Sequence, residues 1–152
     1  MDLYKILLQA HSGIRYLVML LLLVAIVVAF MGWFGNKTYT DGNRKINLFT
    51  LIFTHIQLLF GLFLYFKSPF SQASNMADAM KDSTLRYWTV EHAVMMVIAV
   101  ALITIGHSKT KKLQEALAKH RTVAIFFSLA LIVIIAAIVQ SGRPLFGMTH
   151  LD

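Results

Sequence analysis

The sequence predicts an all-α integral membrane protein, an up-and-down bundle of four helices with both termini on the non-cytoplasmic side. Three observations predict this fold. Hydrophobic residues make up 58% of the 152 positions, whereas charged residues make up only 14%. The apolar residues gather in four stretches, each long enough for the roughly 20 residues that a membrane-spanning helix needs. The basic residues lie mostly between these stretches, where they can indicate how the chain is oriented.

The four helices are expected at about residues 3–34, 45–66, 84–107 and 121–139, and together they form one transmembrane domain over residues 1–152. The first helix should end where glycine and asparagine follow, because these residues tolerate backbone conformations that others avoid. The second should end before Pro69, since proline cannot continue a helix. A polar loop with a short surface helix near residues 76–81 then leads to the third helix. This arrangement leaves no length for a separate soluble domain.

The positions of the basic residues predict the topology. The connections between the first and second helices and between the third and fourth carry eight Lys and Arg residues, whereas the opposite side of the predicted bundle carries five. Because basic connections stay in the cytoplasm, both termini are expected outside it. The net charge of +7 is therefore interpreted as a topology signal, and no nucleic-acid partner is expected.

Composition also limits the possible chemistry. The chain contains no cysteine, which excludes disulfides, thiolate metal ligands and cysteine nucleophiles. It shows no serine–histidine–acid spacing, phosphate-binding loop or zinc-protease motif, so no catalytic residue is assigned. Any chemistry must depend on histidine, and an electron-transfer protein is favoured over a stand-alone enzyme.

Three of the six histidines, His11, His55 and His92, fall within apolar stretches, one on each of the first three helices. An ionisable residue inside a membrane is costly and usually faces the interior of the bundle. Counted from the aromatic residues expected at the interface, His11 and His92 lie about 6–10 Å deep and His55 about 15 Å. The first and third helices can face each other across a bundle diagonal. His11 and His92 are therefore the best-matched pair of axial ligands for the iron of a b-type haem, and His55 is the alternative ligand.

Two charged residues accompany this pair. Arg15 lies one helical turn after His11 on the same face, where a haem propionate, a quinone carbonyl or Glu91 could neutralise it. Glu91 precedes His92 and is either a proton or quinone contact or an ordinary interfacial acid. His107 and His120, at helix ends, are interpreted as solvated.

His55 lies away from a polar stripe on the second helix that indicates a separate contact face with another helix or subunit. The stripe consists of Asn47, Thr50, Thr54, Gln57 and Gly61.

Three short segments, His11-Ser12-Gly13-Ile14-Arg15, Thr54-His55-Ile56-Gln57 and Val90-Glu91-His92, resemble small bacterial four-helix membrane proteins described as cytochrome-b-like. This resemblance implies a haem-binding bundle of the bacterial inner (cytoplasmic) membrane that takes part in quinone-linked or respiratory electron transfer. His11, His55 and His92 would map onto ligand positions. Residues 123–139 offer Ser128 as their single polar side chain, which departs from a two-haem pattern, so one haem b is expected.

The preferred function is thus a b-type cytochrome that relays electrons between a quinol and a redox partner protein. One alternative is a non-catalytic accessory or assembly subunit of a larger membrane complex or homo-oligomer, in which the histidines only form hydrogen bonds between helices. Another is a small transporter or metal carrier in which the three histidines bind Zn²⁺ or Cu²⁺, although further ligands are lacking.

Overall fold

The computed structural model describes residues 2–67 and 76–142, and this part of the chain is all-helical. Four helical segments are long and apolar enough to cross a membrane, which confirms the predicted helical class and the number of long helices in the described part. They are α1 (Leu3–Phe34), α2 (Asp41–Lys67), a composite third segment (Ser83–Thr110) and α6 (Ala116–Ser141).

The first two helices each begin at a side-chain cap. The carboxylate of Asp2 accepts a hydrogen bond from the backbone N–H of Lys5 at 2.8 Å, which satisfies one of the unpaired donors at the start of α1. After α1, Asn36 adopts the left-handed conformation, with φ 48°. Helix α2 begins at Asp41, four residues earlier than predicted, because the Thr40 hydroxyl accepts a hydrogen bond from the Asn43 N–H at 3.1 Å.

The third segment is interrupted. A short helix α3 (Met76–Ala79) is followed by α4 (Ser83–Arg86), a π-helical turn η1 (Tyr87–Glu91) and then α5 (His92–Thr110). A π-turn holds one residue more than an α-turn, so it rotates the side chains that follow it, and such turns occur frequently at functional sites. Here the first residue after the turn is His92.

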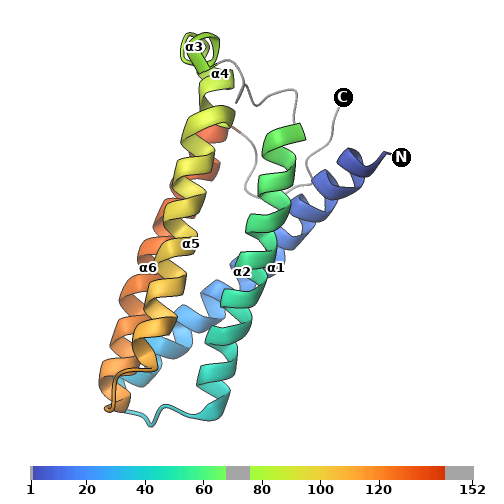
Figure 1. The fold of residues 1–152 in the computed structure, drawn as a ribbon. Coiled ribbons are helices and arrows are strands. Elements are labelled where there is room, and N and C mark those ends of the chain that lie inside the picture. The colour runs from blue at the N-terminus through green and yellow to red at the C-terminus, as the bar shows by residue number, and fades with distance from the viewer. Residues whose placement is uncertain (1, 68–75, 143–152) are drawn as a thin grey trace.

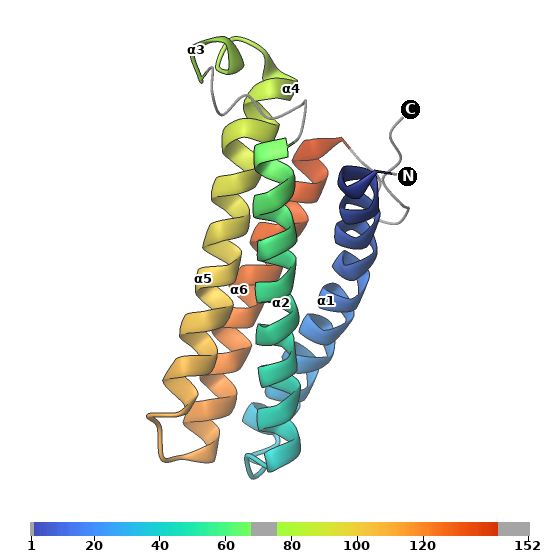
Figure 2. The same ribbon diagram turned by 45° about the vertical axis from the view of Figure 1, so that its right-hand side comes forward.

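The four long segments run alternately up and down (Figure 1). Helices α1 and α5 both pack against α2 and α6, so they lie across a diagonal of the bundle. Figure 1 shows that α1 diverges from α6 toward its N-terminus, and Figure 2 shows the alternating helices from another side. We call the end that holds residues 35–40 and 111–115 the connection end, and the end that holds the start of α1 and the end of α6 the terminal end.

The apolar core lies between α1, α5 and α6 and is concentrated in the half nearer the connection end. Within residues 3–17 of α1 only Ser12 is buried, and residues 92–98 of α5 include no buried side chain. Near the terminal end, α1 and the start of α5 therefore contribute few buried side chains, whereas Tyr87, Ala137 and Ile138 remain buried between η1 and α6. The core cluster consists of Leu22, Ala25, Ile26, Ala29, Ala99, Ile103, Val123, Ala124, Phe127, Ala130, Ile134 and Ile138.

Candidate functional site

His11 lies on α1 near the terminal end and faces α2. A Cβ atom placed on Gly61 would lie 3.2 Å from Nε2 of His11, so the absence of a side chain at Gly61 is what lets the imidazole approach the α2 backbone. One turn before Gly61 on α2, the Gln57 Nε2 donates a hydrogen bond to the backbone carbonyl of His11 at 2.8 Å. The predicted polar stripe of α2 thus meets α1 at this level.

Gln57 also carries a buried oxygen beside His11. Its Oε1 forms no hydrogen bond with any of the described residues. A buried acceptor without a donor costs about 1–3 kcal/mol, and most such atoms in proteins are paired. A donor from outside the chain would relieve this cost.

His92 is positioned by the aromatic residues of the π-helical turn. The centroid of its ring lies 5.1 Å from that of Trp88 and 5.8 Å from that of Tyr87. The Tyr87 hydroxyl donates a hydrogen bond to the carbonyl of Ala137 on α6 at 2.6 Å, and its oxygen lies 3.4 Å from Nδ1 of His92. Because the hydroxyl proton is already used, Tyr87 can only accept from His92. This contact favours the ring with the proton on Nδ1 and the lone pair on Nε2.

Residue counts from one hydrogen bond put His11 and His92 at similar heights along the bundle. The Tyr65 hydroxyl of α2 donates a hydrogen bond to the carbonyl of Thr89 at 2.8 Å, which fixes the level of α2 against η1. Gly61, which faces His11, is four residues from Tyr65, and His92 is three residues from Thr89. At about 1.5 Å per residue, these separations correspond to roughly 6 and 5 Å from the same reference level. Their helices lie across the diagonal, in the half where α1 diverges from α6 (Figure 1).

Two charged residues were predicted at this site. Arg15 is half-buried, and Glu91 forms hydrogen bonds with the third segment and with α6. The guanidinium carbon of Arg15 lies 5.1 Å from the centroid of the Tyr16 ring. Glu91 accepts a hydrogen bond from Nε of Arg86 at 2.8 Å and another from Nε2 of Gln140 at 2.8 Å. Its carboxylate therefore pairs with Arg86 and fastens η1 to the end of α6.

His55 lies apart from this pair. It is exposed, and its Nε2 lies 2.9 Å from the Thr104 hydroxyl on α5. That hydroxyl donates to the carbonyl of Val100 at 2.7 Å, so its oxygen accepts a hydrogen bond from His55. His55 thus links α2 to α5 about 9 Å further along the bundle than Gly61. Within residues 2–67 and 76–142, no group of three or more His, Cys, Asp or Glu side chains is placed to hold a metal ion.

The interpretation of His107 and His120 as solvated residues is wrong. Their exposed fractions are 1% and 2%, so both belong to the interior of the connection end. The His120 ring packs on Gly32, where a Cβ would lie 2.4 Å from a ring atom, and its Nε2 donates to the carbonyl of Thr38 at 3.1 Å. The sequence spacing could have indicated that His120 is buried, because His120 shares one helical face with the core residues 123, 124 and 127.

Buried Nδ1 of His107 forms no hydrogen bond with the described part of the chain.

Comparison with known proteins adds no family to these observations, because no protein-family model, no curated protein and no solved structure matches this chain.

Proposed function

We propose that this chain is a membrane-embedded, b-type cytochrome-like protein in which His11 and His92 bind one haem b for quinone-linked electron transfer. One observation carries the proposal. His11 packs on Gly61, His92 follows the turn that Tyr65 holds, and their helices lie across the diagonal of the bundle.

Membrane insertion is supported by the exterior of the bundle. Large apolar side chains are exposed on all long helices, among them Val27 at 55%, Leu59 at 65% and Ile132 at 62%. Exposure of so much apolar surface to water is unfavourable, whereas contact with lipid is not. The basic connection end would lie in the cytoplasm, as the positive-inside rule requires, and the inner membrane of a bacterium is the proposed location.

The residues of the site fit haem b in the chemistry of their donors. Two neutral imidazoles are a familiar axial ligand set for haem iron, and this set requires no third protein ligand. A histidine that binds a metal usually donates its other ring N–H to a neighbouring acceptor, which fixes the orientation of the ring. The Tyr87 oxygen, 3.4 Å from Nδ1, is placed to be that acceptor for His92.

Each residue of the site has a task in this proposal. His11 and His92 would hold the iron, and bound haem would supply a centre that accepts and releases one electron at a time. Arg15, one turn from His11, would offset the negative charge of a propionate. The buried Gln57 Oε1 would accept a hydrogen bond from a protonated propionate or from the hydroxyl of a quinol. Glu91, held by Arg86 and Gln140, would keep η1 and therefore His92 in place.

An absorption spectrum tests the proposal. Protein purified in mild detergent from haem-replete cells should be red, with a Soret band and an α-band that sharpens on reduction with dithionite. His11→Ala and His92→Ala should each abolish the low-spin spectrum, because each removes one axial ligand. His55→Gln is the matched control, since it changes an intramembrane histidine outside the pair and keeps a donor for Thr104. Circular dichroism of each variant would verify its helix content.

Two results would contradict the proposal. A colourless preparation of folded protein from haem-replete cells would favour the accessory-subunit alternative. Loss of haem in His55→Gln together with its retention in His11→Ala would show that the ligand pair is wrongly assigned.

A further inference from the structure

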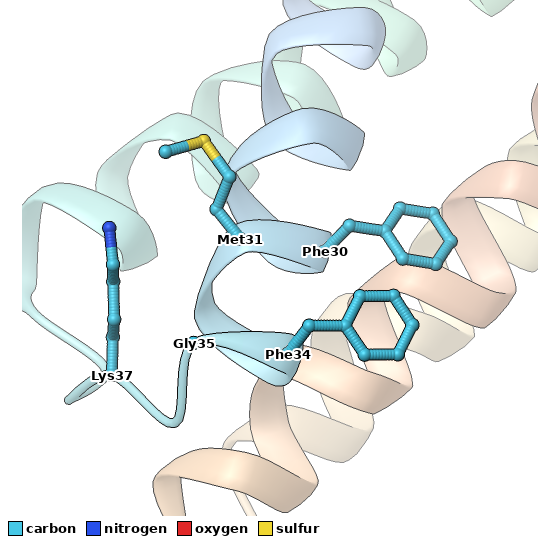
Figure 3. A pocket seen from close by; sticks show the side chains of 5 residues that line it. All are labelled: Phe30, Met31, Phe34, Gly35 and Lys37. Atoms are coloured by element: carbon cyan, nitrogen blue, oxygen red, sulfur yellow. The ribbon is translucent and has the colours of Figure 1, made fainter.

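Two adjoining hollows lie at the connection end, remote from the histidine pair. The first is open, has a volume of about 520 Å³ and is lined by Phe30, Met31, Phe34, Gly35 and Lys37. The second is more enclosed, has a volume of about 230 Å³ and includes the polar residues Lys37, Thr38, Thr40, Asn43 and His120 in its lining. Met31 and Lys37 belong to both. In Figure 3 the Lys37 side chain rises alongside Met31, while Phe30 and Phe34 project together from the other side of the helix end.

The open hollow offers an apolar surface. Phe34 is 75% exposed and Met31 is 54% exposed. The rings of Phe30, Trp33 and Phe34 stack on one another, with centroid separations of 4.8 to 6.0 Å. Aromatic residues at this depth are typical of the boundary between the hydrocarbon region and the lipid headgroups. In a membrane, an acyl chain would lie against this surface.

The enclosed hollow offers hydrogen-bond donors. Its acceptors are already used, since Asn43 Oδ1 accepts from the Thr40 N–H at 2.8 Å and from the Thr40 hydroxyl at 2.9 Å. Asp41, the acidic residue nearest in sequence, is within 2.9 Å of Arg44 and 3.1 Å of Lys45. Within the described ranges no carboxylate forms an ion pair with Lys37. The Lys37 ammonium group and the Asn43 amide N–H groups are therefore available to an acceptor.

We infer that the two hollows form one binding site for an anionic phospholipid, with the phosphate at Lys37 and an acyl chain along Met31, the two residues that line both hollows. Charge complementarity supports this occupant. The two connections and the helix ends beside them carry eight basic residues against two acidic ones, Asp41 and Glu115. The inference rests on the proposed membrane insertion but not on haem binding, so a protein without haem would still select this lipid.

Native mass spectrometry of the purified protein with equal amounts of phosphatidylglycerol and phosphatidylcholine tests this site. The first bound lipid should be phosphatidylglycerol. Lys37→Gln should lower that preference about fivefold, which corresponds to the roughly 1 kcal/mol that one basic residue contributes near an anionic lipid surface. Lys112→Gln is the matched control, because Lys112 is an exposed lysine of the same end that lines neither hollow. Its preference should stay within about twofold of the wild type.

Three results would overturn the inference. An equal decrease in both lysine variants would show that general positive charge, not a site, selects the lipid. An unchanged preference for phosphatidylglycerol in Lys37→Gln would show that Lys37 does not bind the lipid phosphate. Binding of soluble glycerol phosphate as strong as that of the lipid would show that the apolar hollow contributes nothing. A protein that leaves the membrane without detergent would instead contradict the proposed insertion.

Discussion

The two ends of the bundle differ in how closely their helices approach. Near the connection end α1 presents small residues at Ala25, Ala29 and Gly32, and the side chains of α6 pack directly on them. Small residues permit close contact between helix backbones. Toward the terminal end, within residues 3–17, Ser12 is the single buried residue of α1, and α1 diverges from α6 (Figure 1).

This difference teaches that the surroundings of a histidine, not its presence in an apolar stretch, indicate its role. His120 sits in the tight half, where it fills the space above Gly32 and holds the chain at Thr38. His11 and His92 sit in the open half, where their imidazoles are only partly buried.

The largest effect on stability is expected from loss of a core side chain in the tight half. Phe127 has an exposed fraction of 0%, so Phe127→Ala should lower the free energy of unfolding by about 3–5 kcal/mol, through lost contacts and the cavity left behind. Val94→Ala, at a residue of the open half that is 51% exposed, should lower it by less than about 0.5 kcal/mol. Unfolding in mixed micelles with increasing dodecyl sulfate measures both. Equal losses would show that the halves do not differ.

A smaller contrast is expected between two glycines. A Cβ on Gly32 would lie 2.4 Å from the buried ring of His120, so Gly32→Ala should cost about 1–3 kcal/mol by overpacking. A Cβ on Gly61 would lie 3.2 Å from His11, whose half-buried ring can yield. The roughly 1 kcal/mol that alanine gains over glycine in a helix should then leave Gly61→Ala near the wild type. The same unfolding assay compares them, and a greater loss in Gly61→Ala would reverse the assignment of open and tight halves.

Much of this arrangement could be predicted from the sequence, because it depends on local properties. The length of the apolar stretches predicts the four long helices. Helix starts were less well predicted. Residues 41–44 read as a turn because glycine and asparagine are among them, although Thr40 caps a helix there.

The features that could not be predicted depend on contacts between distant residues. The π-helical turn before His92 is held by Tyr65, which lies 24 positions from its partner Thr89. The hydrogen bond from Gln140 to Glu91 likewise joins residues 49 positions apart, whereas the Arg86–Glu91 ion pair is local. The polar stripe of α2 could be recognised from its spacing, but only the structure shows that α1 covers it at Gln57 and Gly61.

The smallest difference in stability is expected between variants that remove two tyrosine hydroxyls, one at each end of the bundle. Tyr39 accepts a hydrogen bond from Nδ2 of Asn47 at 2.8 Å, and Asn47 is 4% exposed, so Tyr39→Phe leaves a buried donor unpaired. A cost of about 1–1.5 kcal/mol is expected. Tyr65→Phe removes the donor to the Thr89 carbonyl in the open half, where about 0.5–1 kcal/mol is expected.

These two variants should differ more in hydrogen exchange than in global stability. Because Tyr65 fastens η1, its loss should speed amide exchange at residues 87–92 and leave the connection end unchanged, whereas Tyr39→Phe should do the opposite. Faster exchange throughout the chain in either variant would mean that the two ends unfold as a single unit. The open half would then not open independently of the tight half.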